Sequence, residues 1–187
     1  MTFQKTKLKL AILVHEGGTQ TNLKAIRDAI DKGKINAEIS AVISDTEETA
    51  EVAGMLEKTS ADYICLAGWK KIIPSEVIKK YENRILNLHP GLIPDVISGD
   101  VSNPDNTKAL WNKGMYGDKA IQNFLDQKST YAGSSIHFLT HNFDFGPVLG
   151  RTFEKIEQND NVESLYARLK KKENDLYIEV LEKLSKN

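Results

Sequence analysis

The sequence predicts an α/β protein with a doubly wound, mostly parallel sheet, an antiparallel addition near the C-terminus and a long C-terminal helix. First, short apolar runs alternate with segments of helical periodicity, which is typical of a parallel sheet covered by helices. Second, two strand-like runs follow each other late in the chain, and third, the last segment has leucines at helical spacing. The 187 residues suffice for one domain, 1–187, with halves of about 1–85 and 86–187.

Strands and helices alternate through the first half. Thr46 and the acidic residues after it predict a helix N-terminus, and Pro74 is expected at the first position of another helix. Leu23, Ile26 and Ile30 give the first helix an apolar face. Parallel strands with right-handed crossovers follow from this order. The expected strands are 7–15, 37–45, 62–69 and 85–89, and the expected helices are 22–34, 46–60 and 74–82.

The second half opens with a change in composition. The segment 95–117 is rich in Gly, Asn, Asp and Ser and has weak periodicity, so we expect a long loop with one short helix over 107–112. Long loops in compact domains are often functional. The elements expected after it are a helix over 120–126, strands over 134–140 and 146–156 joined by 141–145, and a helix over 162–184.

Composition restricts the possible partners. Lys and Arg (25) nearly balance Asp and Glu (26), so charge gives no case for binding nucleic acid or membrane. The single cysteine, Cys65, lies in an apolar run and is expected to be a buried, inert thiol, which suits a reducing cytoplasm. The first residues show no apolar region with a cleavage site, so we expect no signal peptide and a cytoplasmic location. With four histidines in total, the sequence offers at best a poor histidine-rich metal site, and no metal is predicted.

A glycine pair separates the first strand from the first helix, in the stretch EGGTQTNLKAI. Backbone N–H groups exposed there, at a helix N-terminus, would favour an anion such as phosphate. The glycine spacing fits neither a Walker P-loop nor a dinucleotide fingerprint. The alternative is a plain turn in which Thr19 or Thr21 caps the helix.

The stretch ILNLHPGLIP places an amide and an imidazole at a strand end. Asn87 and His89 are two apart and therefore share one face, while Leu86 and Leu88 point the other way before Pro90 ends the strand. An amide can donate to a developing oxyanion, and an imidazolium can donate a proton. Ligands of open α/β sheets bind at the carboxyl ends of strands, which is where this pair is expected. The alternative is a half-buried polar pair bonded to backbone.

The stretch SSIHFLTHNFDFGP supplies a further histidine and a carboxylate. Asp144 precedes a Gly-Pro turn, so it is either a turn carboxylate or a carboxylate aimed at His89 that raises the pKa of its imidazole. His137 and Ser135 share a strand face and are expected to be buried, hydrogen-bonded supports.

The C-terminal helix carries one further pair of charges. Lys170 and Glu173 are three apart and share a helix face. Such a pair usually belongs to a solvated charged face. The alternative is that Lys170 supplies a cation close to the predicted phosphate-binding stretch EGGTQTNLKAI.

These stretches resemble the formyltransferases that use 10-formyltetrahydrofolate, and among them the phosphoribosylglycinamide (glycinamide ribonucleotide, GAR) formyltransferases. The resemblance covers nearly the whole chain and is carried, in order, by GGTQTNLKAI, DYICLAGWKKII, ILNLHPGLIP and SSIHFLTHNFDFGPV. It implies a Rossmann-like formyltransferase fold, with an N-terminal phosphate-binding half and a folate-binding, catalytic second half. It also implies that a formyl group passes from 10-formyltetrahydrofolate to the GAR amine in de novo purine biosynthesis, directly through a tetrahedral intermediate and without metal.

The resemblance also implies a role for each site residue. His89 would act as general acid and electrostatic stabiliser, Asn87 would hold the formyl oxygen, and Asp144 would orient His89 and support its charge. The partners implied are the two small-molecule substrates, for a monomer or homodimer. The residues implied for the ribose phosphate are Gly18, Thr19, Gln20, Thr21, Asn22, Lys170 and Glu173, and those implied for the folate are Trp69, Lys70, Lys71, Ile72, Ile73 and Leu86.

The sequence departs from the family pattern in several places. Gly91 stands where serine is usual, and Trp69-Lys70-Lys71 stands where Phe-Met-Arg is common. The segment between Asp45 and Asp62 is roughly 20 residues shorter than usual, which suggests a lost βα unit. The loop 95–117 is longer than usual and could cover the site as a lid. Two alternatives stay open: a formyltransferase for another small amine, such as an amino-sugar nucleotide, and a shortened paralogue that only binds its ligands.

Overall fold

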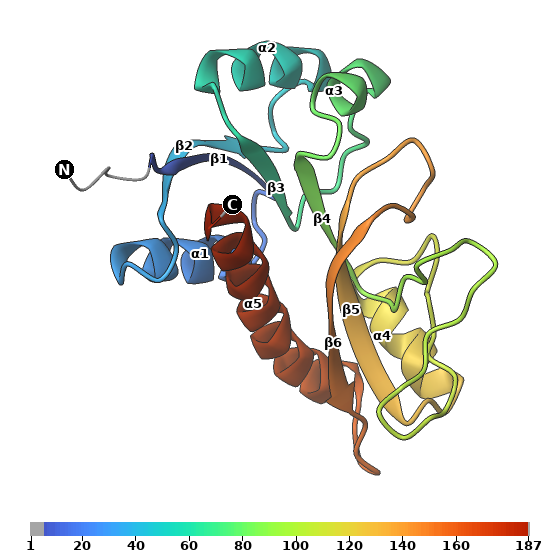
Figure 1. Cartoon of the computed structure of the whole chain (residues 1–187). Coiled ribbons are helices and arrows are strands. Elements are labelled where there is room, and N and C mark those ends of the chain that lie inside the picture. Colours follow the sequence, from blue (N-terminus) through green and yellow to red (C-terminus); the bar gives the residue numbers. More distant parts are fainter. Residues whose placement is uncertain (1–5, 187) are drawn as a thin grey trace. The chain divides into compact units, whose positions relative to one another are not determined.

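The computed structural model describes residues 6–186 and contains a six-stranded mixed sheet with strand order β2-β1-β3-β4-β5-β6 (Figure 1). β1 pairs in parallel with β2 and β3, whereas β5 and β6 are antiparallel. The predicted fold class, mostly parallel with an antiparallel addition near the C-terminus, is therefore confirmed. The strands are β1 (Leu8–Val14), β2 (Ala37–Ser44), β3 (Tyr63–Ala67), β4 (Ile85–His89), β5 (Tyr131–Phe138) and β6 (Val148–Lys155).

Five helices connect or follow these strands within the described residues. The last is the predicted long C-terminal helix, and the others lie close to the predicted ranges. The helices are α1 (Thr21–Asp31), α2 (Thr49–Thr59), α3 (Ser75–Lys80), α4 (Gly117–Asp126) and α5 (Val162–Lys186).

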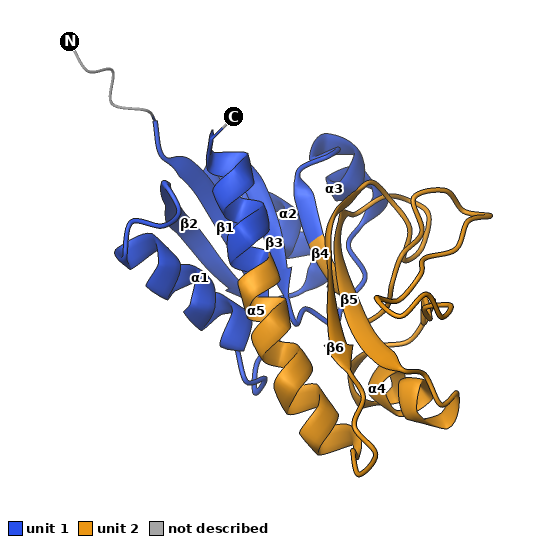
Figure 2. Ribbon diagram, turned by 60° about the horizontal axis from the view of Figure 1, so that its bottom comes forward, with its two compact units in different colours: residues 1–86, 177–187 blue, residues 87–176 orange. Residues whose placement is uncertain are grey.

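The chain divides into two compact units, residues 1–86 with 177–187 and residues 87–176 (Figure 2). The division falls inside β4, close to the boundary expected from the sequence, but the end of α5 belongs to the first unit. In the first unit α1 covers one face of β1, β2 and β3, and α2 covers the other (Figure 1). Because both faces are covered, residues 10–14 of β1 are all buried, and this explains its continuous apolar run.

The second unit has its own apolar core. Residues 132–137 of β5 are buried, although Ser134, Ser135 and His137 among them are polar. Buried polar groups need hydrogen-bond partners, so this strand marks the polar interior of the unit. The apolar core consists of Leu92, Ala109, Ile121, Phe124, Ala132, Leu165 and Leu169.

Several predicted boundaries were wrong. No helix forms over 107–112: Asn103 N donates to Thr107 O and Ala109 N donates to Val101 O, so the segment turns back on itself as an irregular hairpin. Asn106, with φ of 66°, makes that turn. Thr46 does not begin α2 either, because its N–H and hydroxyl both bond Ser44 Oγ in a turn.

Two further boundaries differ from the prediction. Pro74 lies just before α3 rather than in its first position. The strand β5 begins at residue 131 rather than 134, since Ile156 N donates to Thr130 O and extends the antiparallel pairing of β5 with β6.

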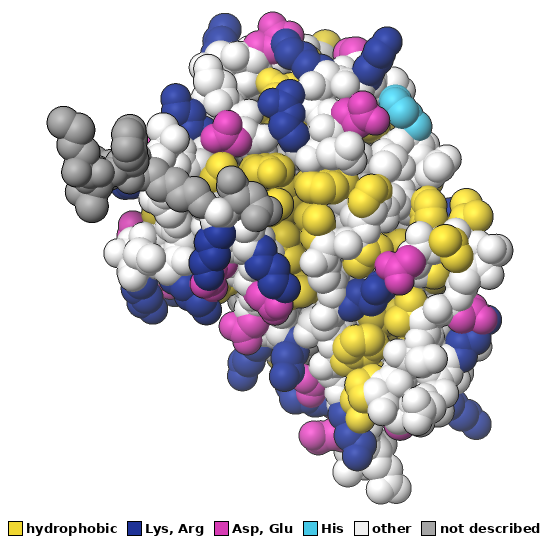
Figure 3. Space-filling model, viewed as in Figure 1, with side chains coloured by type: hydrophobic (Ala, Val, Ile, Leu, Met, Phe, Trp, Pro, Cys, Tyr) yellow, Lys and Arg dark blue, Asp and Glu magenta, His cyan; other side chains and the backbone are white. Residues whose placement is uncertain are grey.

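The surface carries charges of both signs. On the face shown in Figure 3, Lys and Arg side chains are intermixed with Asp and Glu, as the net charge of −1 suggests. No helix of the described chain is both long and apolar enough to cross a membrane. Cys65 is buried as predicted, and burial raises the pKa of its thiol to about 12.

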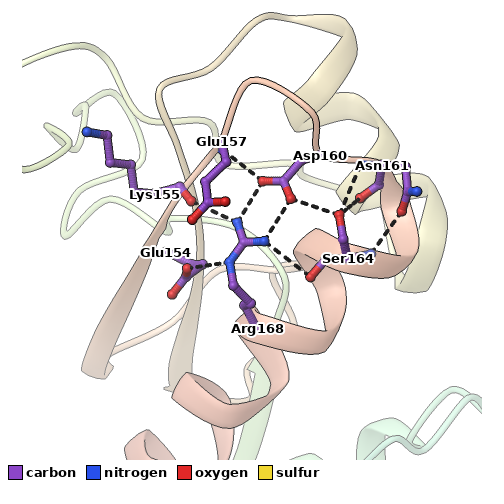
Figure 4. Close-up of polar contacts among 7 residues, drawn as sticks. All are labelled: Glu154, Lys155, Glu157, Asp160, Asn161, Ser164 and Arg168. Carbon is purple, nitrogen blue, oxygen red and sulfur yellow. Dashed lines mark hydrogen bonds and ion pairs between the residues drawn. The ribbon is translucent and has the colours of Figure 1, made fainter.

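Arg168 fastens the loop after β6 to the start of α5 (Figure 4). Its guanidinium donates to both carboxylate oxygens of Asp160, at 2.7 and 2.6 Å, and to Glu154 Oε1 at 2.8 Å. The Asp160 side chain is only 3% exposed, and Arg168 holds its pKa well below the usual range. Asp160 also accepts from Ser164, in the first turn of α5, so one forked cation organises the helix N-terminus.

Replacing Arg168 with methionine is expected to lower the free energy of unfolding by about 2 kcal/mol, because a buried carboxylate loses its charged donors. Urea unfolding followed by circular dichroism measures this. Lys183→Met is the matched control: it removes an exposed ion pair with Glu179 and should cost less than about 0.5 kcal/mol. Equal losses in the two variants would contradict a special role for Arg168.

Candidate functional site

Asn87 and His89 lie at the end of β4 in the second unit, as the two-residue spacing predicts. His89 is 2% exposed and Asn87 is half-buried. Gly91 N donates to His89 O at 2.9 Å, so the chain turns sharply just after the strand. The two side chains therefore sit on a rigid strand end rather than in a flexible loop, which suits precise positioning.

His137 fixes the orientation of the Asn87 amide. The Nδ1 of His137 donates to Phe138 O at 3.0 Å, so its Nε2 carries the lone pair and accepts from Asn87 Nδ2 at 3.1 Å. One amide hydrogen of Asn87 is thereby used, and the second hydrogen is left to donate elsewhere. Burial lowers the pKa of His137 to about 4, which keeps the ring neutral and able to accept.

Both nitrogens of His89 face acceptors. Nδ1 lies 3.5 Å from Asp144 Oδ1, and Nε2 lies 2.7 Å from the backbone carbonyl of Trp111. The short contact to a carbonyl, which can only accept, is a hydrogen bond donated by Nε2. The longer distance to Asp144 is an electrostatic contact rather than a hydrogen bond.

The prediction that the pKa of His89 is raised was wrong. Burial lowers this pKa, and the Asp144 carboxylate and the Trp111 carbonyl only partly oppose the decrease. The sequence shows that a carboxylate is near the imidazole but not how completely the ring is withdrawn from water.

The segment 111–114 holds Asp144 in place. Gly114 N donates to Asp144 Oδ2 at 2.7 Å, and the indole Nε1 of Trp111 donates to Asp144 O at 2.9 Å. Asp144 itself has φ of 48°, in the left-handed region, within the turn that the sequence predicts. The ring of Trp111 packs on that of Phe145, with centroids 5.8 Å apart.

Ser135 ties β5 to the chain that follows His89. Its hydroxyl donates to Gly91 O at 2.7 Å and accepts from Ile93 N at 3.0 Å. Both bonds are buried, so they fix the path of the chain immediately after the catalytic candidates.

The glycine loop lies in the first unit, with Gly18 and Thr19 exposed and Asn22 buried. The helix α1 begins after Gln20, which has φ of 49°, and within residues 6–186 no side-chain hydrogen bond caps it. The glycine loop thus leads directly into the N-terminus of α1, the kind of position at which anions bind.

The candidate folate residues also lie in the first unit, and two of them have other partners. Lys70 Nζ lies 2.9 Å from Nε2 of His15, whose Nδ1 bonds Asp45, and Lys71 Nζ donates to Glu47 O. Ile72 is 84% exposed, whereas Ile73 and Leu86 are buried. Trp69 Nε1 is buried without a hydrogen-bond partner in the described part of the chain.

Lys170 and Glu173 lie in the second unit but have different environments. Glu173 is buried and accepts from Ser134 Oγ at 2.7 Å, and burial raises the pKa of its carboxyl. The usual interpretation of such a pair, a solvated charged face, was thus wrong for Glu173. Lys170 Nζ lies 4.3 Å from the centre of the Tyr166 ring, a cation–π contact.

Sequence reasoning missed Trp111, Gly114 and His15. Trp111 lies in a segment without periodicity, and its hydrogen bonds with His89 and Asp144 each use a backbone carbonyl as acceptor, so no residue pattern predicts them. The one sequence signal that could have indicated the Trp111 contact is Gly91, which stands where serine is usual in the family that the sequence resembles. Among residues 6–186, no three His, Cys, Asp or Glu side chains gather as a possible metal site.

Comparisons with known proteins agree with this fold. Residues 46–181 match the family described as "Formyl transferase". The chain is 28% identical to "Phosphoribosylglycinamide formyltransferase, chloroplastic" of Arabidopsis thaliana, over 92% of this chain and 64% of the relative. The protein of the same name from Vigna unguiculata is also 28% identical, over 94% and 60%. The chain thus spans a little over three fifths of the length of these curated relatives.

Solved structures show the same fold. Glycinamide ribonucleotide transformylase 1 from Symbiobacterium toebii superposes with a TM-score of 0.82 at 24% identity, over all of this chain and 91% of the other. Phosphoribosylglycinamide formyltransferase from Bacillus halodurans gives a TM-score of 0.77 at 24% identity, over 94% of each chain. At this identity the likeness establishes the fold alone. Because the family match covers most of the sequence, the chain belongs to the formyl transferase family.

Proposed function

We propose that this protein transfers a formyl group from 10-formyltetrahydrofolate to the amine of GAR. The observation that carries the proposal is the arrangement at the end of β4, where the Asn87 amide is fixed by the buried His137 ring and the His89 imidazole by Trp111 and Asp144. Membership of the formyl transferase family supports the reaction, and the names of the plant relatives support GAR as acceptor. We expect a cytoplasmic enzyme of small molecules, as a monomer or homodimer.

The proposed chemistry is direct transfer. The GAR amine attacks the formyl carbon, the carbonyl oxygen becomes an oxyanion, and the bond from that carbon to N10 of the folate then breaks. The free amide hydrogen of Asn87 would donate to the oxyanion, and the positive charge of the protonated His89 imidazole would stabilise it electrostatically. The amine must lose one proton and N10 must gain one, and His89 and Asp144 would serve this transfer as acid and orienting carboxylate.

Each substrate is assigned its own residues. The backbone of Gly18 to Asn22, at the N-terminus of α1, would hold the ribose phosphate of GAR. Since Glu173 is buried, its part would be to hold β5 through Ser134. Trp69 to Ile73 would line the folate. Leu86, which is fully buried, would help to fix the strand β4 to which it belongs.

The test is an assay with purified protein, GAR and 10-formyl-5,8-dideazafolate, followed by the absorbance of the deformylated product. We expect turnover that requires both substrates. Omitting GAR is the matched control, because turnover without GAR would indicate hydrolysis of the formyl folate instead of transfer.

Two other outcomes would overturn GAR as acceptor. Turnover with an amino-sugar nucleotide but not with GAR would assign the protein to another small amine. No turnover with either acceptor, combined with GAR binding in calorimetry, would identify a binding protein that has lost the reaction.

A further inference from the structure

The backbone carbonyl of Trp111 lies against the reactive ring of the site. It accepts a hydrogen bond from Nε2 of His89 at 2.7 Å, and His89 is 2% exposed, so water has little access to this contact. Trp111 lies in the long loop 95–117, which no proposed step of the reaction uses. The contact therefore needs a separate explanation.

Gly91 makes the contact possible. A Cβ atom at this position would lie 1.8 Å from Trp111 O and 2.8 Å from Nε2 of His89. Both distances are far inside van der Waals contact, and the closest atom belongs to the backbone, which cannot rotate away as a flexible side chain can. Serine, the usual residue here in the family that this sequence resembles, would occupy the space that the carbonyl fills. Gly91 and the Trp111 carbonyl are thus complementary features of this chain.

The Trp111 carbonyl is held in place by hydrogen bonds of the Trp111 side chain and of the next residue, Asn112. The next residue, Asn112, is buried and donates through Nδ2 to Pro90 O and Ala120 O, both at 3.0 Å. Its Oδ1 accepts from Asn123 Nδ2 at 2.8 Å, so every side-chain atom that can bond has a partner. The indole of Trp111 is anchored on Asp144 O. The carbonyl is therefore a fixed acceptor and not the transient position of a moving loop.

We propose that Trp111 is a positioning residue: its carbonyl keeps a proton on Nε2 of His89, so that Nδ1 is the nitrogen that exchanges a proton during formyl transfer. The proposal rests on the proposed function, since it assigns the reacting atom of the same site. Gly91 takes part because it leaves room for the carbonyl.

The assignment follows from the number of protons on an imidazole. A neutral ring has one N–H, and a carbonyl can only accept, so this proton stays on Nε2 and the lone pair stays on Nδ1. When Nδ1 takes up a proton, the imidazolium lies between the Trp111 carbonyl and Asp144, with one acceptor for each N–H. The proton that arrives at Nδ1 leaves from Nδ1, and the ring returns to its starting state after each turnover.

The first test needs no substrate. Imidazole ¹⁵N NMR of the whole chain is expected to show neutral His89 protonated at Nε2. The rings of His15 and His137 direct Nδ1 at acceptors, so a proton on Nε2 distinguishes His89 from them, and loss of the signal in His89→Gln assigns it. A neutral His89 with its proton on Nδ1, or a mixture of both tautomers, would overturn the proposal.

The second test removes the room for the carbonyl. Gly91→Ala should displace the Trp111 carbonyl, produce a mixture of tautomers at His89, and lower kcat by about 10- to 100-fold with little change in KM. Gly54→Ala is the matched control, because a Cβ on Gly54 would meet nothing within 4 Å, and it should leave kcat and the NMR spectrum unchanged. Unchanged kcat in Gly91→Ala would refute the role, and increased kcat would show that the loop inhibits.

A third variant covers the case in which Gly91→Ala does not fold. Asn112→Ala leaves room at Gly91 but removes the bonds to Pro90 and Ala120, and it should give the same tautomer mixture and loss of kcat. If Asn112→Ala keeps both the Nε2–H tautomer and kcat, the anchoring of the carbonyl is irrelevant and the proposal fails. Failure of the proposed function looks different, because a wild-type chain without turnover can still show the Nε2–H tautomer.

Discussion

Replacing His89 with glutamine is expected to lower kcat for formyl transfer by about 10²- to 10⁴-fold while the chain stays folded. Glutamine can still donate an N–H to the Trp111 carbonyl, so the buried acceptor keeps a partner. It cannot take up and release a proton near neutral pH. The measurement is kcat with saturating GAR and 10-formyl-5,8-dideazafolate.

The matched control is His141→Gln, because His141 is exposed and lies outside the proposed site. It should leave kcat within about twofold of the wild-type value. Circular dichroism and urea unfolding of His89→Gln separate a catalytic loss from an unfolded chain. A folded His89→Gln protein that keeps more than about a tenth of the wild-type kcat would show that His89 is not the acid of the reaction.

The parts of the site that follow from alternation along a strand could be predicted. Asn87 and His89 share a face because they are two apart on β4, and Ser135 and His137 share a face on β5 for the same reason. Asn87 and His137 then meet directly between β4 and β5. The fold class followed in the same way from apolar runs that alternate with helical segments.

The parts that depend on an irregular path could not be predicted. Trp111 reaches His89 only because the chain turns at Asn106 and then runs back to Pro90, and neither step has a hydrophobic period. Short-range signals favoured a helix over 107–112, but bonds to Val101 and Asn103 compete with it and prevail. Tertiary contacts overrode local propensity there, as they often do in loops at functional sites.

The sequence predicts that a carboxylate acts on the pKa of His89, but not whether the carboxylate or burial has the larger effect. Asp144 does oppose the loss of charge on His89, as expected from a nearby carboxylate. Burial acts more strongly in the opposite direction, and burial is a property of the whole second unit. Burial also lowers the pKa of His137, and there the effect can be tested through stability.

His137 is expected to make the chain less stable as the pH falls from about 6.5 to about 4. In the folded chain burial lowers its pKa to about 4, whereas in the unfolded chain the pKa keeps its ordinary value near 6.5. Between these values the unfolded chain binds a proton that the folded chain does not, so acid favours unfolding. The contribution of the neutral His137 ring to the free energy of unfolding is fully present above pH 6.5. By pH 4 this free energy has fallen by about 3 kcal/mol.

The measurement is the free energy of urea unfolding at several pH values between 4 and 7.5, for the wild-type chain and for His137→Gln. Glutamine can donate to Phe138 O and accept from Asn87 but does not titrate, so its curve should be flatter by about 3 kcal/mol over this range. His89, whose pKa is also lowered, contributes a slope of the same sign to both curves, and the difference between them isolates His137. His141→Gln, at an exposed position, should follow the wild-type curve. If His137→Gln follows it too, folding does not lower the pKa of His137, and the claim that burial keeps this ring neutral and able to accept from Asn87 fails.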